Sequence, residues 1–208
     1  MTDINQEIIN IEYGMLDCVQ NHEGRLPCQD DMQMFAAMRD SQLSAWSEEL
    51  RESYLNDLHA ARQEGRNLYD EKYGYMLELT NPVAYDGIRS MLPPRSLEKN
   101  WLIEWISKAQ VVWQEALAAL YPRLVGEERA IRRSEADPCA DSFETYLFGE
   151  LSTYSVETLR RYAAHVERLQ KMGENLNEMI LRNTVAIYGY GSLEAAEAHL
   201  SGRRAAAG

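Results

Sequence analysis

The sequence has few cysteines, few basic residues and no long apolar run. Its three cysteines are an odd number, which fits a reducing compartment better than a disulfide framework. No apolar run approaches the ~18 residues that a membrane span needs. The opening segment, MTDINQEIINIEYG, is acidic and amphipathic, whereas a signal peptide begins basic and continues uniformly apolar. We therefore expect a cytoplasmic protein, bacterial in style, with no membrane span.

Basic residues are outnumbered by acidic ones. The chain has 21 Lys and Arg against 33 Asp and Glu, which gives a net charge of −12. This sign argues against binding to nucleic acid or to an anionic membrane surface. With 45% hydrophobic and 26% charged residues, the composition is typical of a soluble globular protein. We expect a small-molecule partner, and a chain that is a monomer or a homodimer.

The sequence also lacks the short motifs of common metal, cofactor and nucleophile sites. It has no H-E-x-x-H, C-x-x-C or Glu-x-x-His pair, no Gly-rich phosphate loop, no dinucleotide fingerprint and no G-x-S-x-G elbow. We therefore expect no cofactor and no metal. A carboxylate-rich cation site around Asp31, Asp141, Glu144 and Glu150 is left open.

What the sequence does contain is an internal repeat. Residues 35–68 match residues 143–176 at a fixed offset of 108 positions without a gap. The identities pair Phe35 with Phe143, Leu43 with Leu151, Ser44 with Ser152, Ser47 with Ser155, Glu49 with Glu157, Tyr54 with Tyr162, Gly65 with Gly173, Asn67 with Asn175 and Leu68 with Leu176. Such self-similarity indicates a duplicated unit. A pocket is expected at the interface that two such copies share.

Apolar residues recur at helical spacing along almost the whole chain, and no period-2 run indicates a strand. One stripe in the first copy is Leu50, Tyr54, Leu58 and Ala61, and its counterpart is Thr158, Tyr162, Val166 and Leu169. Helices are expected to stop near Pro93-Pro94. The sequence thus predicts an all-α protein with two pseudo-two-fold-related helical halves, 1–94 and 95–200, forming one compact bundle-like domain, followed by a flexible tail, 201–208.

The repeated G-x-N-L segment resembles a binding signature but has a plainer interpretation. Gly65 and Gly173 stand where a helix needs a left-handed residue after its last turn. Asn67 and Asn175 are then placed to cap the next helix. Ser47 and Ser155 are placed to cap the preceding helices in the same way. The segment is therefore interpreted as a helix–turn–helix connection.

Several longer motifs resemble one small bacterial family. They are N-x-x-G-R-x-x-C-Q-x-D-x-x-x-F-x-x-M-R-x-S-Q at 21–42, G-R-N-L-x-x-E-K-Y at 65–73, S-F-E-T-Y-L-x-x-E-L-x-T-Y-S at 142–155 and T-V-x-x-Y-G-Y-x-S at 184–192. The family is catalogued as domain of unknown function 4125. The resemblance covers nearly the whole chain. It implies a shared fold and a set of residues to examine, including Arg25, Gln29 and Asp31, and it implies no chemistry.

Cys28 is the first candidate for catalysis. It is predicted to lie just before a helix N-terminus, where the helix dipole and free N–H groups stabilise a thiolate. Arg25 would strengthen this effect, and Asp31 would oppose it. The alternative is that Cys28 is a small buried filler.

Glu150 is the second candidate. It interrupts the apolar face of Phe143, Tyr146 and Tyr154 at the position that Gln42 occupies in the first copy. Desolvation would raise the pKa of such a carboxylate into the range of a general acid or base. The alternative is a structural ion pair with Arg39 or another arginine. Lys72 is interpreted as a solvated helix residue.

Two functions therefore remain open. The first is an enzyme or ligand-binding protein that uses acid–base or thiol chemistry on a small polar or amino-acid-like molecule between the two halves. Its catalytic residues would be Cys28 and Glu150, and its binding residues Arg25, Gln29, Asp31, Arg39, Gln42, Trp46, Tyr146 and Tyr154. The second is a non-catalytic helical module that binds a protein partner or a regulatory ligand, for which the nine methionines would provide an adaptable surface.

Overall fold

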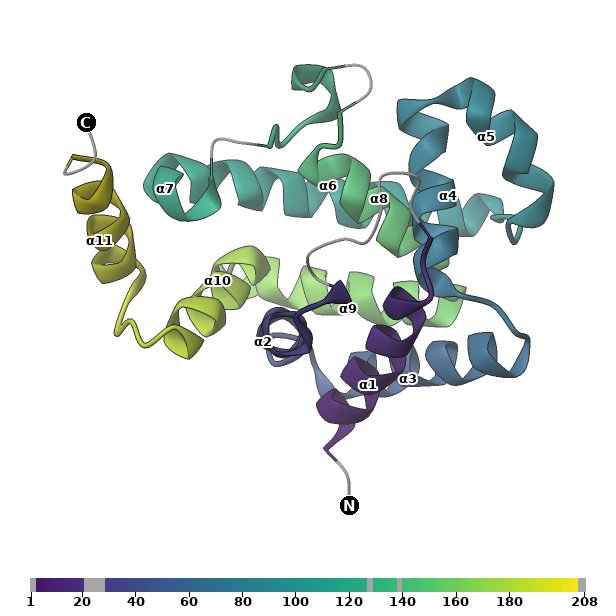
Figure 1. The fold of residues 1–208 in the computed structure, drawn as a ribbon, viewed down its shortest axis with the longest axis horizontal. Coiled ribbons are helices and arrows are strands. Elements are labelled where there is room, and N and C mark those ends of the chain that lie inside the picture. The colour runs from purple at the N-terminus through teal and green to yellow at the C-terminus, as the bar shows by residue number, and fades with distance from the viewer. Residues whose placement is uncertain (1–2, 21–28, 127–128, 138–139, 206–208) are drawn as a thin grey trace.

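The computed structural model describes residues 3–20, 29–126, 129–137 and 140–205. Within these ranges every regular element is a helix, as the sequence predicts. The helices are α1 (Ile4–Asp17), α2 (Met32–Leu43), α3 (Glu48–Gln63), α4 (Leu68–Thr80), α5 (Pro82–Ile88), the 3-10 helix η2 (Arg89–Met91), α6 (Leu97–Leu120), α7 (Pro122–Val125), the 3-10 helix η3 (Arg133–Glu135), α8 (Phe143–Thr153), α9 (Val156–Met172), α10 (Leu176–Ile187) and α11 (Leu193–Ala205) (Figure 1). None of the described helices combines the length and the apolarity that crossing a membrane requires.

The two G-x-N-L segments are helix connections, which confirms the capping interpretation. Gly65 and Gly173 follow α3 and α9 with φ angles of +69° and +71°, in the left-handed region that favours glycine. The side chain of Asn67 accepts bonds from the N–H groups two and three residues further on, in the first turn of α4, and Asn175 does the same for α10. The connection between α3 and α4 therefore takes only residues 64–67, and that between α9 and α10 only residues 173–175.

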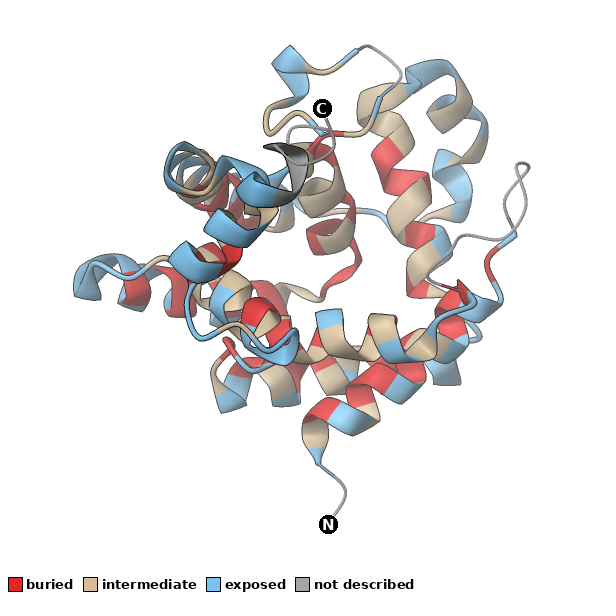
Figure 2. Cartoon of the chain, turned by 60° about the vertical axis from the view of Figure 1, so that its left-hand side comes forward, coloured by how far each residue is buried: buried red, intermediate tan, exposed pale blue. Residues whose placement is uncertain are grey.

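The predicted apolar stripes form the centre of the core. Every member of the stripe on α3 and of its counterpart on α9 is at most 3% exposed, and α3 packs directly on α9. Ser47 and Ser155 cap these two helices. Figure 2 shows the buried residues on the inward faces of the helices, with exposed residues turned outward.

The helices that precede and follow this central pair in the sequence each pack on a helix of the other half. Helix α4 packs on α8, and α10 packs on α2. At the first of these crossings the backbones approach closely at Gly149: a Cβ there would lie 2.6 Å from Met76 Cγ and 2.9 Å from the Lys72 carbonyl oxygen. Helix α1 covers α3, and α6 covers α9.

The C-terminal end differs from the sequence prediction. The helix α11 continues through Ala205, so five residues of the predicted tail at 201–208 are helical. The segment contains no proline, and the high helix propensity of its Ala and Arg residues offsets the low propensity of Gly202. Helix α11 lies beside α7 and the end of α10 at one side of the molecule (Figure 1). Its Leu193 and Ala196 form a small cluster with Val185, apart from the main core.

Candidate functional site

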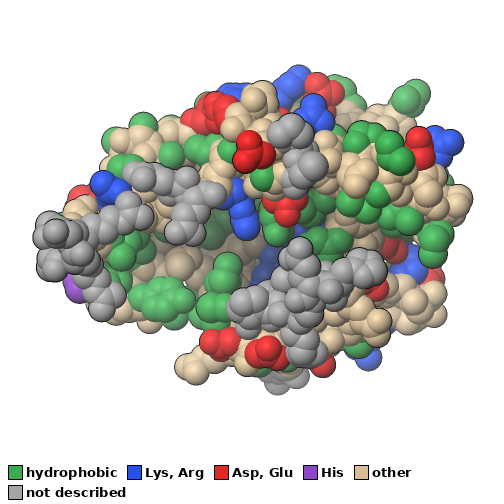
Figure 3. Space-filling model, turned by 45° about the horizontal axis from the view of Figure 1, so that its top comes forward, with side chains coloured by type: hydrophobic (Ala, Val, Ile, Leu, Met, Phe, Trp, Pro, Cys, Tyr) green, Lys and Arg blue, Asp and Glu red, His purple; other side chains and the backbone are tan. Residues whose placement is uncertain are grey.

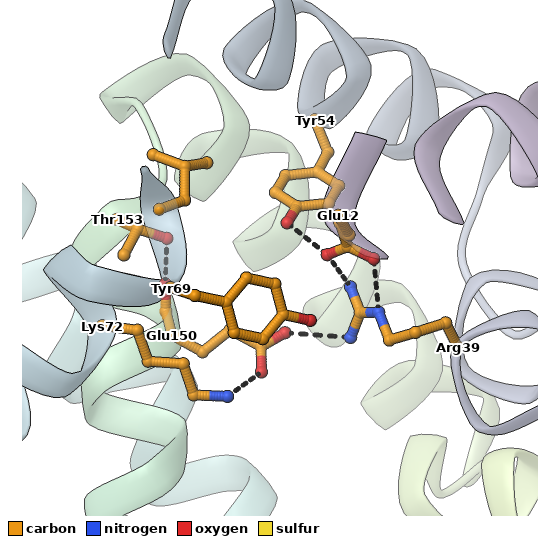
Figure 4. Close-up of a pocket in the computed structure, with 8 residues that line it drawn as sticks. Glu12, Arg39, Tyr54, Tyr69, Lys72, Glu150 and Thr153 are labelled. Atoms are coloured by element: carbon orange, nitrogen blue, oxygen red, sulfur yellow. Dashed lines mark hydrogen bonds and ion pairs between the residues drawn. The ribbon is translucent and has the colours of Figure 1, made fainter. Parts of the chain in front are cut away.

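Four charged side chains from four helices meet in the interior of the protein (Figure 4). They are Glu12 of α1, Arg39 of α2, Lys72 of α4 and Glu150 of α8. The exposed fractions of the Glu12 and Arg39 side chains are 2% and 10%, whereas those of Lys72 and Glu150 are 16% and 21%. The cluster therefore has a deeply buried inner pair and an outer pair that reaches solvent.

The inner pair is held tightly. The Nε and Nη2 atoms of Arg39 donate to the two carboxylate oxygens of Glu12, each at 2.7 Å. This bidentate geometry is the strongest form of a guanidinium–carboxylate contact. The hydroxyl of Tyr54 donates a third bond to Glu12 Oε1 at 2.6 Å. Both carboxylate oxygens of Glu12 are thus occupied by donors from within the protein.

The outer pair is held more loosely. Glu150 Oε1 lies 3.3 Å from Arg39 Nη1, and Glu150 Oε2 lies 3.3 Å from Lys72 Nζ. The amide of Gln42 donates to Glu150 Oε1 at 3.4 Å. The one short bond to this carboxylate, 2.7 Å, comes from the hydroxyl of Tyr154, the residue that directly follows α8.

Charge and burial act against each other on the pKa of Glu150. Desolvation raises this pKa, but the cations of Lys72 and Arg39 and the bonds from Tyr154 and Lys72 lower it to about 2. For Arg39, desolvation lowers the pKa, and the carboxylates of Glu12 and Glu150 outweigh it, so the pKa is raised well above its usual value. Burial and the nearby carboxylates raise the pKa of Tyr54 and Tyr154. At neutral pH both tyrosines are therefore protonated donors, and Glu150 is a carboxylate.

A small cavity lies against this cluster. Its lining residues are Glu12, Arg39, Tyr54, Leu68, Tyr69, Lys72, Glu150 and Thr153. The cavity has an empty volume of about 250 Å³, but the space open to the centre of a water molecule is about 20 Å³, which is room for roughly one water. The hydroxyl of Tyr69 points toward the Arg39–Glu150 contact (Figure 4). A larger ligand therefore requires the outer side chains to move.

The structure brings several of the predicted site residues together. Gln42 and Glu150 meet directly, as the repeat register predicts, and Arg39 and Tyr154 both contact Glu150. Trp46 is buried nearby and packs on three tyrosine rings, the closest being Tyr162 with ring centroids 5.2 Å apart. Trp46 therefore supports the wall of the site and does not line the cavity.

Other predicted residues have different surroundings. Gln29 donates to the carbonyl oxygens of Leu16 and Val19 at the end of α1, so it is an anchor for that end. Asp31 is the N-cap of α2. Tyr146 lies on the outer side, where Lys72 Nζ is 5.3 Å from its ring centroid. The hypotheses for Cys28 and Arg25 fall on residues outside the described ranges.

Sequence reasoning missed the two other charged residues of the cluster. Glu12 follows the apolar residues Ile8 and Ile11 along α1 and precedes Met15. Its position on an apolar helix face could therefore have indicated that it is buried. The interpretation of Lys72 as a solvated residue is wrong, because it lies one helical turn after Leu68 and one before Met76, both of which are buried. In both cases a charged residue among the apolar residues of one helix face indicated an oppositely charged partner inside the protein.

The cation site that the sequence leaves open, around Asp31, Asp141, Glu144 and Glu150, is not seen among the described residues. Among them, no three His, Cys, Asp or Glu side chains gather where they could hold a metal ion. The two buried carboxylates of the cluster are instead separated by the guanidinium of Arg39.

The family model described as "Protein of unknown function (DUF4125)" matches residues 2–198. The chain belongs to this family. No curated protein and no solved structure matches it. The site must therefore be interpreted from its own geometry.

Proposed function

We propose that this member of the family binds a small polar molecule at the charged cluster, through Lys72 and Glu150. The observation that carries the proposal is the convergence of four charged side chains from four helices on one cavity. Removing charges from water is costly, and a buried ion pair is often no more stabilising than an apolar pair of similar volume. A cluster of two such pairs is therefore better explained by binding than by stability alone.

The outer pair is the part suited to a ligand. Its bonds of 3.3 Å are weaker than the inner bonds of 2.7 Å, so they are the first to exchange for bonds to another molecule. Lys72 would take an acidic group of the ligand, and Glu150 a basic group. The rings of Tyr69 and Tyr146, both within 6 Å of Lys72 Nζ, would cover the ligand.

The ionisation of the site favours binding over acid–base chemistry. A general base works best when its pKa lies near the working pH, and the pKa of Glu150 is about 2. A carboxylate of this kind is a permanent acceptor that orients a ligand. The tyrosines, whose pKa values are raised, are permanent donors at neutral pH. The thiol chemistry predicted for Cys28 stays a separate hypothesis.

The proposal includes the duplication inferred from the sequence repeat. Asn67 donates a side-chain bond to the carbonyl oxygen of Met15, and Asn175 donates the equivalent bond to the carbonyl oxygen of Trp113. Helix α1 therefore contacts the first repeat in the same way as part of α6 contacts the second. When α1 is aligned with α6 on these two bonds, Glu12 and Gln110 occupy equivalent positions.

This alignment supports one charged site, to which both halves contribute, and no pseudo-symmetric copy of it. Tyr54 donates to the charged Glu12, whereas the matching Tyr162 accepts from the neutral Gln110. In the repeat register, the counterparts of Arg39 and Lys72 are Leu147 and Ile180, which pack against the core. The pseudo-symmetric counterparts of the cluster residues are thus uncharged, as expected if a single binding site is kept where the two halves meet.

The alternative function, a module for a protein partner, has weaker support. Large exposed apolar side chains occur on many elements, among them Met38 of α2, Val83 of α5, Trp101 of α6 and Met172 of α9. On the face drawn in Figure 3 the apolar side chains form separate groups around a hollow. A partner site would more typically be one continuous apolar patch.

A thermal-shift screen with a matched pair of variants tests the proposal. We expect a polar metabolite from a broad panel to raise the Tm of the parent and of Lys171→Met, but not of Lys72→Met. Lys171 is the control because it pairs with Glu167 on the exposed face of α9. The proposal fails if no compound in the panel raises the Tm of the parent and of Lys171→Met without raising that of Lys72→Met.

A further inference from the structure

A second cleft lies at the other end of the α4–α8 pair. The first cavity is lined by the beginning of α4 and the end of α8. The second is lined by the end of α4 and the beginning of α8, together with one face of α6 and η3. Its volume of about 390 Å³ lies within the ~300–1,000 Å³ of small-molecule sites. The two cavities share no lining residue.

A fixed cation forms one wall of this cleft. The side chain of Arg95 is 9% exposed and lies between two rings, with its Cζ 5.0 Å from the centroid of Tyr75 and 4.9 Å from that of Phe148. Arg95 also donates to Ser152 Oγ at 3.1 Å and pairs with Glu78. Its guanidinium is therefore held in place before any ligand arrives, which lowers the entropic cost of binding.

The wall formed by α6 contains a hydroxyl without a partner. Ser107 is 8% exposed, and its Oγ has no hydrogen-bond partner among the described residues. A hydroxyl in a helix usually bonds to a carbonyl of the preceding turn, and a buried hydroxyl left without any bond is uncommon. Because Ser107 lines the cleft, a polar atom of a ligand seated there could bond to it.

Charges of both signs surround an apolar floor. The floor includes Ile103 and Phe148. At the rim, Glu104 and Lys108 form an exposed pair along α6, and Arg133 faces the same cleft. Three basic and three acidic residues line the cleft in total: Arg95, Lys108, Arg133, Glu78, Glu104 and Glu144.

We propose that this cleft binds a small zwitterion with an apolar body, an α-amino acid with an apolar side chain. The cations, Arg95 and Arg133, would take the carboxylate, and Glu104 the ammonium group. The apolar side chain would lie on Ile103 and Phe148. A plain anion or a nucleotide fits less well, because the three carboxylates that line the cleft oppose a ligand with negative charge only.

Titration with L-leucine as the probe tests this assignment. We expect calorimetry to show binding of L-leucine at millimolar concentration or below. Two analogues should bind at least about tenfold more weakly, 4-methylpentanoate because it lacks the ammonium group and isopentylamine because it lacks the carboxylate. Equal binding of either analogue would overturn the zwitterion assignment, and absence of L-leucine binding would overturn the site.

Variants of exposed rim residues locate the binding without disturbing the fold. Glu104→Ala should weaken L-leucine binding about tenfold and leave 4-methylpentanoate binding unchanged. The control is Glu167→Ala, which breaks the matching exposed pair with Lys171 on α9 and should change neither. Lys72→Met should leave L-leucine binding intact, which distinguishes this cleft from the charged cluster. Loss of binding in Lys72→Met with normal binding in Glu104→Ala would overturn the proposal.

Discussion

At the scale of single residues, the ionisation of Glu150 links the site to stability. Its pKa in the folded protein is about 2, against an ordinary value of 4.5. A carboxyl group whose pKa is lowered by folding stabilises the folded state at pH values above its ordinary pKa. That stabilisation is lost as the pH falls through the folded pKa.

Glu150→Gln should therefore lower the free energy of unfolding at pH 7 by about 2 kcal/mol, because Lys72 loses its carboxylate partner. The difference from the parent should shrink as the pH falls from about 4.5 toward 2. Urea denaturation of the parent and the variant at pH 7 and at pH 3 measures this difference in the free energy of unfolding. Glu178→Gln, which breaks an exposed pair with Arg182, should cost less than about 0.5 kcal/mol. An undiminished difference at low pH would contradict the assigned pKa.

A second residue-scale prediction compares two matched tyrosines. Tyr54→Phe removes a buried bond to the carboxylate of Glu12 and should cost about 1.5–3 kcal/mol. Tyr162→Phe removes a bond to the neutral amide of Gln110 and should cost about 0.5–1.5 kcal/mol. Both rings are buried, so each substitution removes one buried hydroxyl, and the two variants differ only in the group to which that hydroxyl was bonded. Equal costs in chemical denaturation would argue against a charged inner pair.

At the scale of helices, the crossing of α4 and α8 depends on the missing side chain of Gly149. Gly149→Ala should destabilise the protein by about 1–3 kcal/mol, because the new methyl group would meet the backbone oxygen of Lys72. Gly14→Ala in α1 is the control, since a Cβ there meets nothing within 4 Å, and it should be neutral or stabilising by up to about 1 kcal/mol. The Tm values of the two variants, which should move in different directions, check this.

The helices themselves could be predicted from the sequence because their signals are local. The caps at Ser47, Asn67 and Asn175 each act within three residues of chain, and the stripe on α3 follows from spacing alone. The end of α11 could not be predicted in this way, because Ala and Arg residues are common in both helices and tails.

The site could be predicted in part. The meeting of Gln42 with Glu150 followed from the repeat register, since it is a contact between equivalent positions. The bonds of Glu12 to Arg39 and of Lys72 to Glu150 join unrelated positions, which no local pattern or repeat relates. Their pairing depends on how α1 and α4 pack, and that is a property of the folded chain.

At the scale of the whole molecule, the two halves of the sequence complete each other. Each half contributes helices that pack on the other half: α4 on α8, α10 on α2 and α3 on α9. A separate half would leave these apolar faces exposed to water. We therefore expect the two halves, 1–94 and 95–208, to fold together as one unit.

Fragments 1–94 and 95–208 test this interdependence. Each fragment alone should lack a cooperative unfolding transition, and mixing the two should restore helicity in an equimolar complex. Circular dichroism of the separate and mixed fragments, followed by thermal melting, measures the effect. The intact chain is the control. A fragment that melts cooperatively by itself would show that its half folds independently.

The close contact at Gly149 has a mechanical consequence. Helix α4 touches α8 there between Lys72 and Met76, while Lys72 itself belongs to the charged cluster and Glu78 to the second cleft. If α4 tilts as a rigid rod about this contact, one cavity widens while the other narrows. We therefore expect a ligand in one cavity to change the affinity of the other cavity, and thermodynamic linkage makes that effect equal in both directions.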